Sequence, residues 1–231
     1  MRELKKMKSQ KLLFSAIVVS VLSVGIHLTL FIYKSASTTV PPSTVSPYTT
    51  VERVIDGDTF ILNSGIRVRL RGLEAPELGL CGSEQAKKYL ENLVLGKPVV
   101  IKDSFSDKYG RIEGFVYQDD RFINEEMIVS GWSRFDFNKT DQQDKLALAT
   151  RQAQDKKTGV FSSLCYQQTN PDNPKCGIKG NISTKTLIKQ YLFPGCTSYQ
   201  STVVEKDRGE QWFCSEPDAK DSGFVKSGAC R

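Results

Sequence analysis

Acidic and basic side chains lie close together in the stretch from Val54 to Glu77, VIDGDTFILNSGIRVRLRGLEAPE. The candidate chemical groups in it are carboxylates and a guanidinium, those of Asp56, Asp58, Glu74, Glu77 and Arg69. Carboxylate oxygens suit a hard divalent cation, and a guanidinium binds a phosphate through paired N–H donors. This combination therefore suits a metal ion held beside a phosphate.

Short strands joined by tight turns are predicted for this stretch. Asp-Gly-Asp-Thr is typical of a turn, in which Gly57 would supply backbone freedom between two short acids. Residues 60–62 and 66–73 are predicted strands on either side of an Asn-Ser-Gly turn. The candidate groups would therefore be carried by a β scaffold.

Arginines alternate with apolar residues in the second of these strands. Because side chains alternate between the faces of a strand, Arg67, Arg69 and Arg71 should share one face. Pro76 should end the strand and leave the glutamates around it in the loop that follows. An ordinary solvated face with surface ion pairs would give the same pattern. Asp56 is predicted to form the turn rather than to bind a ligand directly.

Further motifs follow at matching intervals. DKYGR occupies residues 107–111 and INEEMIVSGW occupies residues 123–132, after VIDGDT and RLRGLEAPE. On these motifs the chain resembles the staphylococcal-nuclease-like (thermonuclease) family from about Tyr48 to about Ser163. The resemblance implies an α+β, mainly β fold, in which a five-stranded oligonucleotide-binding (OB-fold) barrel carries three packed helices.

A calcium site is also implied by the resemblance. Asp58 and Glu74 would be carboxylate ligands, and the main-chain carbonyl of Ala75 would be a third oxygen. Ligation by oxygen alone favours Ca²⁺ over softer metals. The family commonly has aspartate at the position of Glu74, and the extra methylene is expected to weaken metal binding and catalysis without abolishing them.

The same resemblance implies roles in phosphodiester hydrolysis. Arg69 and Arg111 would clamp the phosphate, because a guanidinium suits paired phosphate oxygens. Glu77 would be the general base beside the attacking water. Lys108 and Tyr109 would contact a neighbouring phosphate.

Hydrophobic periodicity and turn residues predict the elements of residues 48–168, the nuclease-like domain. Strands are expected at residues 50–54, 60–62, 66–73, 99–102, 111–117, 121–123 and 132–137. Helices are expected at residues 83–95, 124–130 and 141–156. Ser83 and Asn124 should cap the first two helices. Aromatic residues stack on the base in the family that the chain resembles, and by that resemblance Phe137 would take the place of one of them.

An N-terminal membrane anchor is predicted from charge and hydropathy. The basic leader at residues 1–11 precedes an apolar run at 12–33 that is long enough to cross a bilayer as a helix. The Ser/Thr/Pro-rich residues 34–47 would form an extended spacer. We therefore expect a single-pass protein of the cell membrane with a cytoplasmic N-terminus and an outward-facing catalytic domain, or a secreted protein if the anchor is cleaved.

The six cysteines are expected to form disulfides outside the cytoplasm. A bond between Cys81 and Cys165 would staple the loop after Glu77 to the end of the nuclease-like domain. Residues 169–231, the C-terminal module, look like a small module that accompanies some envelope-associated bacterial nucleases. Its cysteines, which allow three pairings, are Cys176, Cys196, Cys214 and Cys230. A four-cysteine zinc site is the alternative, although the usual Cys-x-x-Cys spacing is missing.

These features together predict a membrane-anchored, calcium-dependent nuclease that acts on DNA and also on RNA with low sequence specificity. The formal net charge of +6 suits a polyanionic partner or an anionic surface. One alternative is a barrel that binds nucleic acid but has lost most of its activity, which only Glu74 favours. Another is a protein whose C-terminal module binds an envelope polymer or a partner. No obligate protein partner is predicted.

Overall fold

The computed structural model describes residues 49–136 and 141–230. The predicted leader, anchor and spacer, together with Phe137, lie outside these residues. Within them no helix is both long enough and apolar enough to cross a membrane. The described residues all fall in one compact unit of the chain.

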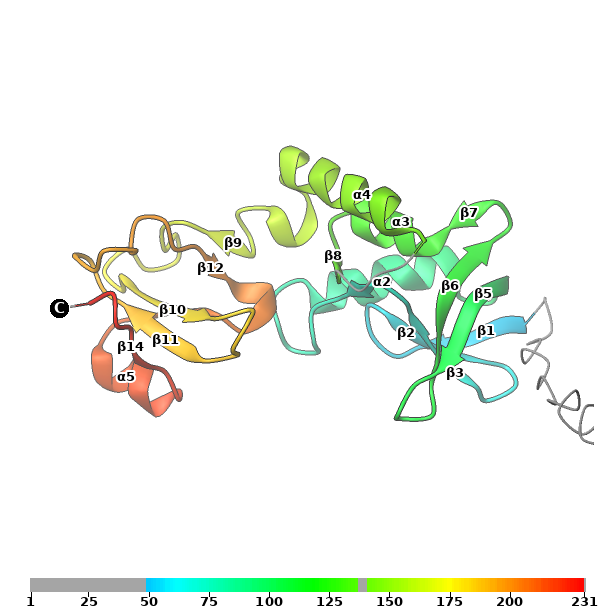
Figure 1. The fold of residues 1–231 in the computed structure, drawn as a ribbon, viewed down its shortest axis with the longest axis horizontal. Helices are drawn as coiled ribbons and strands as arrows, with labels where there is room; N and C mark the ends of the chain where they lie inside the picture. Colours follow the sequence, from blue (N-terminus) through cyan, green and yellow to red (C-terminus); the bar gives the residue numbers. More distant parts are fainter. Residues whose placement is uncertain (1–48, 137–140, 231) are drawn as a thin grey trace, which may run out of the picture. The chain divides into compact units, whose positions relative to one another are not determined.

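A closed five-stranded barrel forms the first part of the described chain (Figure 1). Its strands run in the order β3–β2–β1–β5–β6, and a parallel pairing of β3 with β6 closes the cylinder. The strands are β1 (Thr49–Val54), β2 (Thr59–Leu62), β3 (Arg67–Leu70), β5 (Pro98–Ser106) and β6 (Ile112–Gln118). The short strand β7 (Arg121–Phe122) forms a hairpin with β6. With helices packed on it, this barrel fits the OB-fold that the sequence predicts.

Three helices each bury one apolar face. α2 (Ser83–Val94) and α3 (Ile123–Val129) pack on barrel strands, and α4 (Gln143–Lys156) packs mainly on α3. Apolar residues recur on them at helical spacing, as in α2, where Ala86, Leu90 and Val94 are fully buried. These faces join the barrel interior in one hydrophobic cluster. The core therefore fixes the strands that carry the candidate groups.

The strand predicted at residues 66–73 is broken in two. β3 ends at Leu70, and Gly72, with a φ of 73°, turns the chain before β4 (Leu73–Glu74). β4 pairs with β8 (Arg134–Phe135), which is shorter than the strand predicted there. The break therefore sets Glu74 opposite Arg134 instead of opposite a barrel strand.

Both predicted helix caps are wrong. Ser83 is the first helical residue of α2, and Gly82, with a φ of 85°, precedes it. α3 begins at Ile123, so Asn124 lies inside the helix and is fully buried. Its side chain accepts from the Val116 N–H at 2.9 Å and donates to the Arg71 carbonyl at 2.8 Å. These long-range bonds fasten α3 to the barrel, which outweighs the local preference of asparagine for a cap.

The C-terminal module has a sheet and a core of its own (Figure 1). The sheet has the order β13–β10–β11–β14, with strands β10 (Ile178–Ile182), β11 (Lys189–Leu192), β13 (Gln211–Phe213) and β14 (Val225–Lys226). It packs with α5 (Glu216–Asp221) around Tyr191, Phe213, Ala219 and Phe224. Another pair of strands, β9 (Tyr166–Gln167) and β12 (Val204–Glu205), links the end of the nuclease-like domain to the module.

All the cysteines are paired in disulfides, and none is free. Cys81 and Cys165 form the predicted bond between the loop after Glu77 and the end of the nuclease-like domain. In the module the pairs are Cys176–Cys214 and Cys196–Cys230. Because zinc is bound by thiolates and these sulfurs are bonded to one another, the alternative of a zinc site is wrong.

Candidate active site

Asp58 lies at the end of a short turn, and its side chain is only 5% exposed. Asp56 Oδ1 accepts a hydrogen bond from the Asp58 N–H at 3.0 Å, so Asp56 forms the turn as predicted. Asp58 Oδ1 accepts from Arg69 Nη1 at 2.6 Å and from the Thr59 hydroxyl at 2.7 Å. Because β2 pairs with β3 so that Thr59 lies opposite Arg69, the barrel register itself brings the acid to the guanidinium.

Asp58 is a buried carboxylate whose pKa lies above its ordinary value. Burial raises the pKa of Asp58 to about 6, although the Arg69 guanidinium lowers it, and the neighbouring Asp56 raises it further. A buried carboxylate with a raised pKa is stabilised by a proton or by additional positive charge. Asp58 is therefore suited to bind a cation beyond its pairing with Arg69.

Gly57 is required here by close packing. It is not among the residues with a positive φ, so the expectation that it supplies backbone freedom is wrong. A Cβ at this position would lie 2.5 Å from the Cβ of Ala75 and 2.6 Å from that of Ala86. The turn thus passes directly against α2 and the loop after β4. The same approach lets the Ala75 N–H donate to Asp58 Oδ2 at 3.2 Å.

A cleft of about 220 Å³ opens beside the loop after β4, and we name it the acidic cleft. The predicted site residues that line it are Arg69, Glu74, Ala75 and Glu77. Glu74 and Glu77 are exposed, and within the described residues neither side chain forms an ion pair or a hydrogen bond. Two carboxylates without an ion pair among the described residues therefore share one cleft with the predicted phosphate clamp Arg69.

Arg111, Lys108 and Tyr109 form a neighbouring group that does not line the acidic cleft. Asp107 orients Arg111, since its Oδ2 accepts from Arg111 Nε at 2.7 Å. The ring of Tyr109 is 70% exposed and lies within 5.3 Å of the Arg111 guanidinium. Lys108 Nζ lies 4.9 Å from the same ring. The group thus presents cations and an aromatic face to solvent.

Strand register relates this group to Arg69. In the parallel pairing of β3 with β6, Val68 lies opposite Ile112 and Arg69 lies opposite Glu113. Because side chains alternate along a strand, Arg111, two residues before Glu113, lies on the face of Arg69. The fold therefore places the two predicted phosphate clamps on neighbouring chain segments of one barrel face.

The chemistry of the predicted ligand set suits a hard divalent cation, although Asp58 does not line the acidic cleft as Glu74 and Ala75 do. The candidate ligands are the carboxylates of Asp58 and Glu74 and the main-chain carbonyl of Ala75, all of them oxygen. The raised pKa of Asp58 is consistent with a need for more positive charge at that carboxylate. Within residues 49–136 and 141–230, no group of three or more acidic, histidine or cysteine side chains gathers as a metal site. The remaining ligands would therefore be main-chain and water oxygens.

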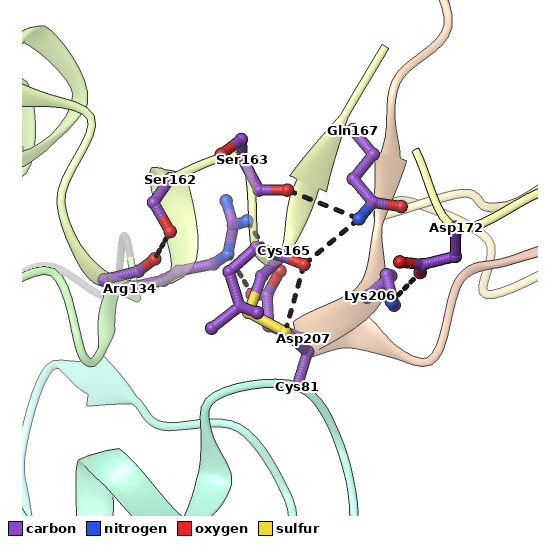
Figure 2. Close-up of a disulfide and its surroundings, with 11 residues drawn as sticks. Cys81, Arg134, Ser162, Ser163, Cys165, Gln167, Asp172, Lys206 and Asp207 are labelled. Atoms are coloured by element: carbon purple, nitrogen blue, oxygen red, sulfur yellow. Dashed lines mark hydrogen bonds and ion pairs between the residues drawn. A yellow bond between two sulfur atoms is a disulfide. The ribbon is translucent and has the colours of Figure 1, made fainter. Parts of the chain in front are cut away.

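Sequence reasoning missed the far wall of the acidic cleft. Besides Arg134, it is lined by residues of the C-terminal module, which are Ile182, Leu187, Asp207 and Arg208. Arg134 Nε and Nη2 donate to the carboxylate of Asp207 at 2.7 and 3.1 Å. Lys206 N–H donates to the Cys165 carbonyl, so this ion pair lies close to the Cys81–Cys165 disulfide (Figure 2). The paired residues are 73 positions apart, and no local pattern connects them.

Residues 67–163 match the family described as Staphylococcal nuclease homologue. A probable staphylococcal-like nuclease of Oryza sativa subsp. japonica is 33% identical over 103 residues, which are 45% of this chain and 31% of that protein. An uncharacterized endonuclease of Escherichia coli is 30% identical over 115 residues, which are 48% of this chain and 75% of that protein. An uncharacterized endonuclease of Haemophilus influenzae is 35% identical over 85 residues.

The family match covers the barrel from β3 onward together with the helices α2, α3 and α4. The chain spans only 31% of the length of the rice relative, but it spans 75% of the E. coli endonuclease. The matched segment contains the acidic cleft residues of the barrel and the group around Arg111. This chain therefore belongs to the family of staphylococcal nuclease homologues.

Proposed function

We propose that the protein is a nuclease that hydrolyses phosphodiester bonds of DNA and RNA with low sequence specificity. The observation that carries the proposal is the acidic cleft, in which Arg69 lies with the unpaired Glu74 and Glu77. Relatives that are named nucleases and endonucleases support the same activity. A cleft with cationic and anionic groups of this kind can bind a phosphate and activate a water molecule.

Arg69 and Arg111 are proposed to bind the non-bridging oxygens of the scissile phosphate. Each guanidinium is held by an aspartate, Arg69 by Asp58 and Arg111 by Asp107. Because these pairs restrict the side chains, less conformational entropy is lost when phosphate binds. The positive charge stabilises the charge that develops on the phosphoryl oxygens in the transition state.

Glu77 is proposed as the general base. It is exposed and unpaired within the described residues, and it lines the same cleft as Arg69. A carboxylate free of an ion pair can accept a proton from a water molecule bound beside the phosphate. Lys108 and Tyr109, beside Arg111, are proposed to contact the next phosphate along the strand.

Calcium is the proposed cofactor, held by Asp58, Glu74 and the carbonyl of Ala75. When bound, it would supply electrophilic charge at a phosphoryl oxygen. Glu74 is one methylene longer than aspartate, and β4 fixes its backbone opposite Arg134. Glu74→Asp is therefore expected to tighten calcium binding measured by isothermal titration calorimetry, and unchanged or weaker binding would contradict this role of Glu74.

The enzyme is proposed to act outside the cytoplasm, anchored by residues 12–33 with the basic leader inside. The disulfides support this placement, because such bonds persist in oxidising compartments. Protease treatment of intact cells, followed by detection of the nuclease-like domain, tests it. Protection of the domain in intact cells, with digestion only after lysis, would contradict an outward orientation.

The activity is tested by incubating the full chain with single- and double-stranded DNA and with RNA, in calcium and in chelator. We expect cleavage in calcium and none in chelator. A Glu77→Gln variant should lose activity by about 100-fold, as expected for loss of a general base. Glu52→Gln, at an exposed residue of β1 that does not line the acidic cleft, should leave the activity unchanged. Binding of DNA without cleavage in any divalent ion would instead favour the alternative of a binding module.

A further inference from the structure

The C-terminal module forms part of the walls of two adjoining clefts. The acidic cleft is one, and a larger cleft of about 660 Å³ is the other. We name the second the α4 cleft, because Ala147, Thr150, Arg151 and Gln154 of α4 line it. Both clefts share Glu74 and Arg134 from the nuclease-like domain, and Leu187 and Arg208 from the module. A strand bound at the acidic cleft would therefore continue directly into the α4 cleft.

A buried ion-pair network fixes this wall to the barrel. Arg134 binds Asp207, whose side chain is 3% exposed, and its Nη1 lies 3.4 Å from Glu205 Oε1. The Arg134 guanidinium also lies 4.7 Å from the centre of the Phe161 ring. Because β8 carries Arg134 opposite Glu74, the module is attached at the same short strand pair that holds a candidate metal ligand. The C-terminal module is thus fixed to the strand pair that carries Glu74.

Arg208 follows Asp207 directly, and within the described residues its one ion pair is with Glu205. Its Nε lies 3.5 Å from Glu205 Oε2, which is an ion-pair distance, yet this buried Nε makes no hydrogen bond. No side-chain hydrogen bond of Arg208 is found within the part of the chain that the structure describes. A guanidinium that lines a cleft with unused N–H donors suits a phosphate ligand. On the opposite wall, Arg151 of α4 is exposed and forms no ion pair with the described residues.

Leu187 supplies an apolar surface at the same place. It lies in the loop between β10 and β11, is 73% exposed and has a φ of 59°, which is uncommon for a residue with a side chain. The loop is held by the Leu187 N–H, which donates to the Ser183 carbonyl at 2.8 Å. A strained, exposed leucine between two clefts is a feature that contact with an apolar ligand surface, such as the face of a base, would explain.

We propose that the α4 cleft is a second nucleotide subsite, in which Arg208 and Arg151 bind a phosphate adjoining the scissile one and Leu187 contacts its base. This inference rests on the proposed nuclease function. It makes the C-terminal module a part of the substrate-binding surface for a nucleic-acid strand, not a separate binding domain. The module would then raise affinity for oligonucleotides and leave the chemistry at the scissile phosphate to the barrel.

The test compares the full chain with Arg208→Ala, Arg208→Lys and Arg151→Ala. Binding of a fluorescent single-stranded decanucleotide is measured in chelator, so that no cleavage is required. Arg208→Ala and Arg151→Ala should each raise Kd by about tenfold and should lower the slope of log K against log salt by about 0.7. Arg208→Lys should weaken binding of the decanucleotide less than Arg208→Ala does, because the positive charge remains. Thermal unfolding of each variant shows whether the fold is retained.

Arg121→Ala is the matched control, because this substitution removes the same charge. Arg121 is an exposed arginine of β7 and lines neither cleft. An equal effect of Arg121→Ala and Arg208→Ala would overturn the subsite. The subsite would also be overturned if Arg208→Ala lowered the cleavage rate of a dinucleotide as much as it lowered that of the decanucleotide. If Arg208→Ala weakens binding but the unchanged chain cleaves nothing, the subsite stands and the proposed nuclease function fails.

Discussion

Arg69 Nη1 donates to Asp58 Oδ1 at 2.6 Å, and this bond joins a candidate phosphate clamp to a candidate metal ligand. Arg69 lies on β3 and Asp58 lies in the turn before β2. The pair is largely buried, with 20% of the Arg69 side chain and 5% of the Asp58 side chain exposed. Charged groups in such a position interact more strongly than at the surface. A change at either residue is therefore expected to affect both metal and phosphate binding.

The stability of the protein in chelator should depend on pH through Asp58. The pKa of Asp58 in the folded protein is raised to about 6, above its ordinary value of 3.8, so the folded state takes up a proton first as pH falls. Its contribution to the free energy of unfolding therefore increases as pH falls through 6 and is complete below 3.8. Between about pH 7 and about pH 5 the gain should be on the order of 1 kcal/mol. Urea unfolding of the unchanged protein and of Asp58→Asn measures this effect, and the variant should not gain stability between these pH values. An equal pH dependence of stability in both proteins would contradict the role of Asp58.

Replacing Gly57 should disturb the site through packing. In Gly57→Ala, the new Cβ meets the Cβ atoms of Ala75 and Ala86 at 2.5 and 2.6 Å, so the loop after β4 or α2 must move. We expect a loss of about 1–3 kcal/mol in stability and weaker calcium binding by calorimetry. Gly65→Ala is the control, because that Cβ meets nothing within 4 Å although φ is +82°. It should lose stability without any change in calcium affinity.

The Arg134–Asp207 pair should contribute more to stability than an exposed pair does. Removing Arg134 leaves Asp207 buried at 3% side-chain exposure without its bidentate partner. Arg134→Met should therefore lower the free energy of unfolding by about 3 kcal/mol. The Arg121–Glu126 pair, with side chains 46% and 36% exposed, is the comparison. The coupling energy of the Arg121–Glu126 pair in a double-mutant cycle should stay below about 1 kcal/mol. If the Arg134–Asp207 pair gave the same coupling energy, this ion pair would not attach the module firmly.

The Cys81–Cys165 disulfide should stabilise the fold and hold the loop of the acidic cleft. It closes a sequence separation of 84 residues, for which chain-entropy arguments give up to about 4 kcal/mol. Replacing both cysteines with serine should lower the unfolding temperature and weaken calcium binding. The matched change at Cys176 and Cys214, which lie in the module, should lower stability without altering calcium affinity. If both changes altered calcium affinity equally, the disulfide would have no specific role at the cleft.

Local patterns predicted the barrel strands and the helical core faces, because alternation and helical spacing report burial directly. They failed where long-range contacts decide the structure. Asparagine is a common helix-capping residue, but the side chain of Asn124 bonds to distant main-chain groups of Val116 and Arg71 from inside α3. Gly57 resembles a turn glycine, but its neighbours Ala75 and Ala86 come from other segments.

The candidate site was predictable only in part for the same reason. The spacing within β3 and the loop after it places Arg69, Glu74 and Glu77 in one cleft, as the motifs imply. The opposite wall depends on Arg134 and Asp207, which meet only because β9 pairs with β12 and a disulfide closes the domain. Arg208 and Leu187 reach the cleft through that tertiary arrangement. No repeat or spacing in the sequence marks them.

The cleft around Arg69 is proposed to hydrolyse phosphodiesters. A decisive experiment compares the rates of DNA cleavage in calcium by the full chain, by Arg69→Ala and by Arg67→Ala. Arg67 is an exposed arginine of the same strand that does not line the acidic cleft. Arg69→Ala should lower the rate by at least about 100-fold, as expected for loss of a transition-state donor, and Arg67→Ala should leave it unchanged. Equal rates in all three proteins would contradict the account.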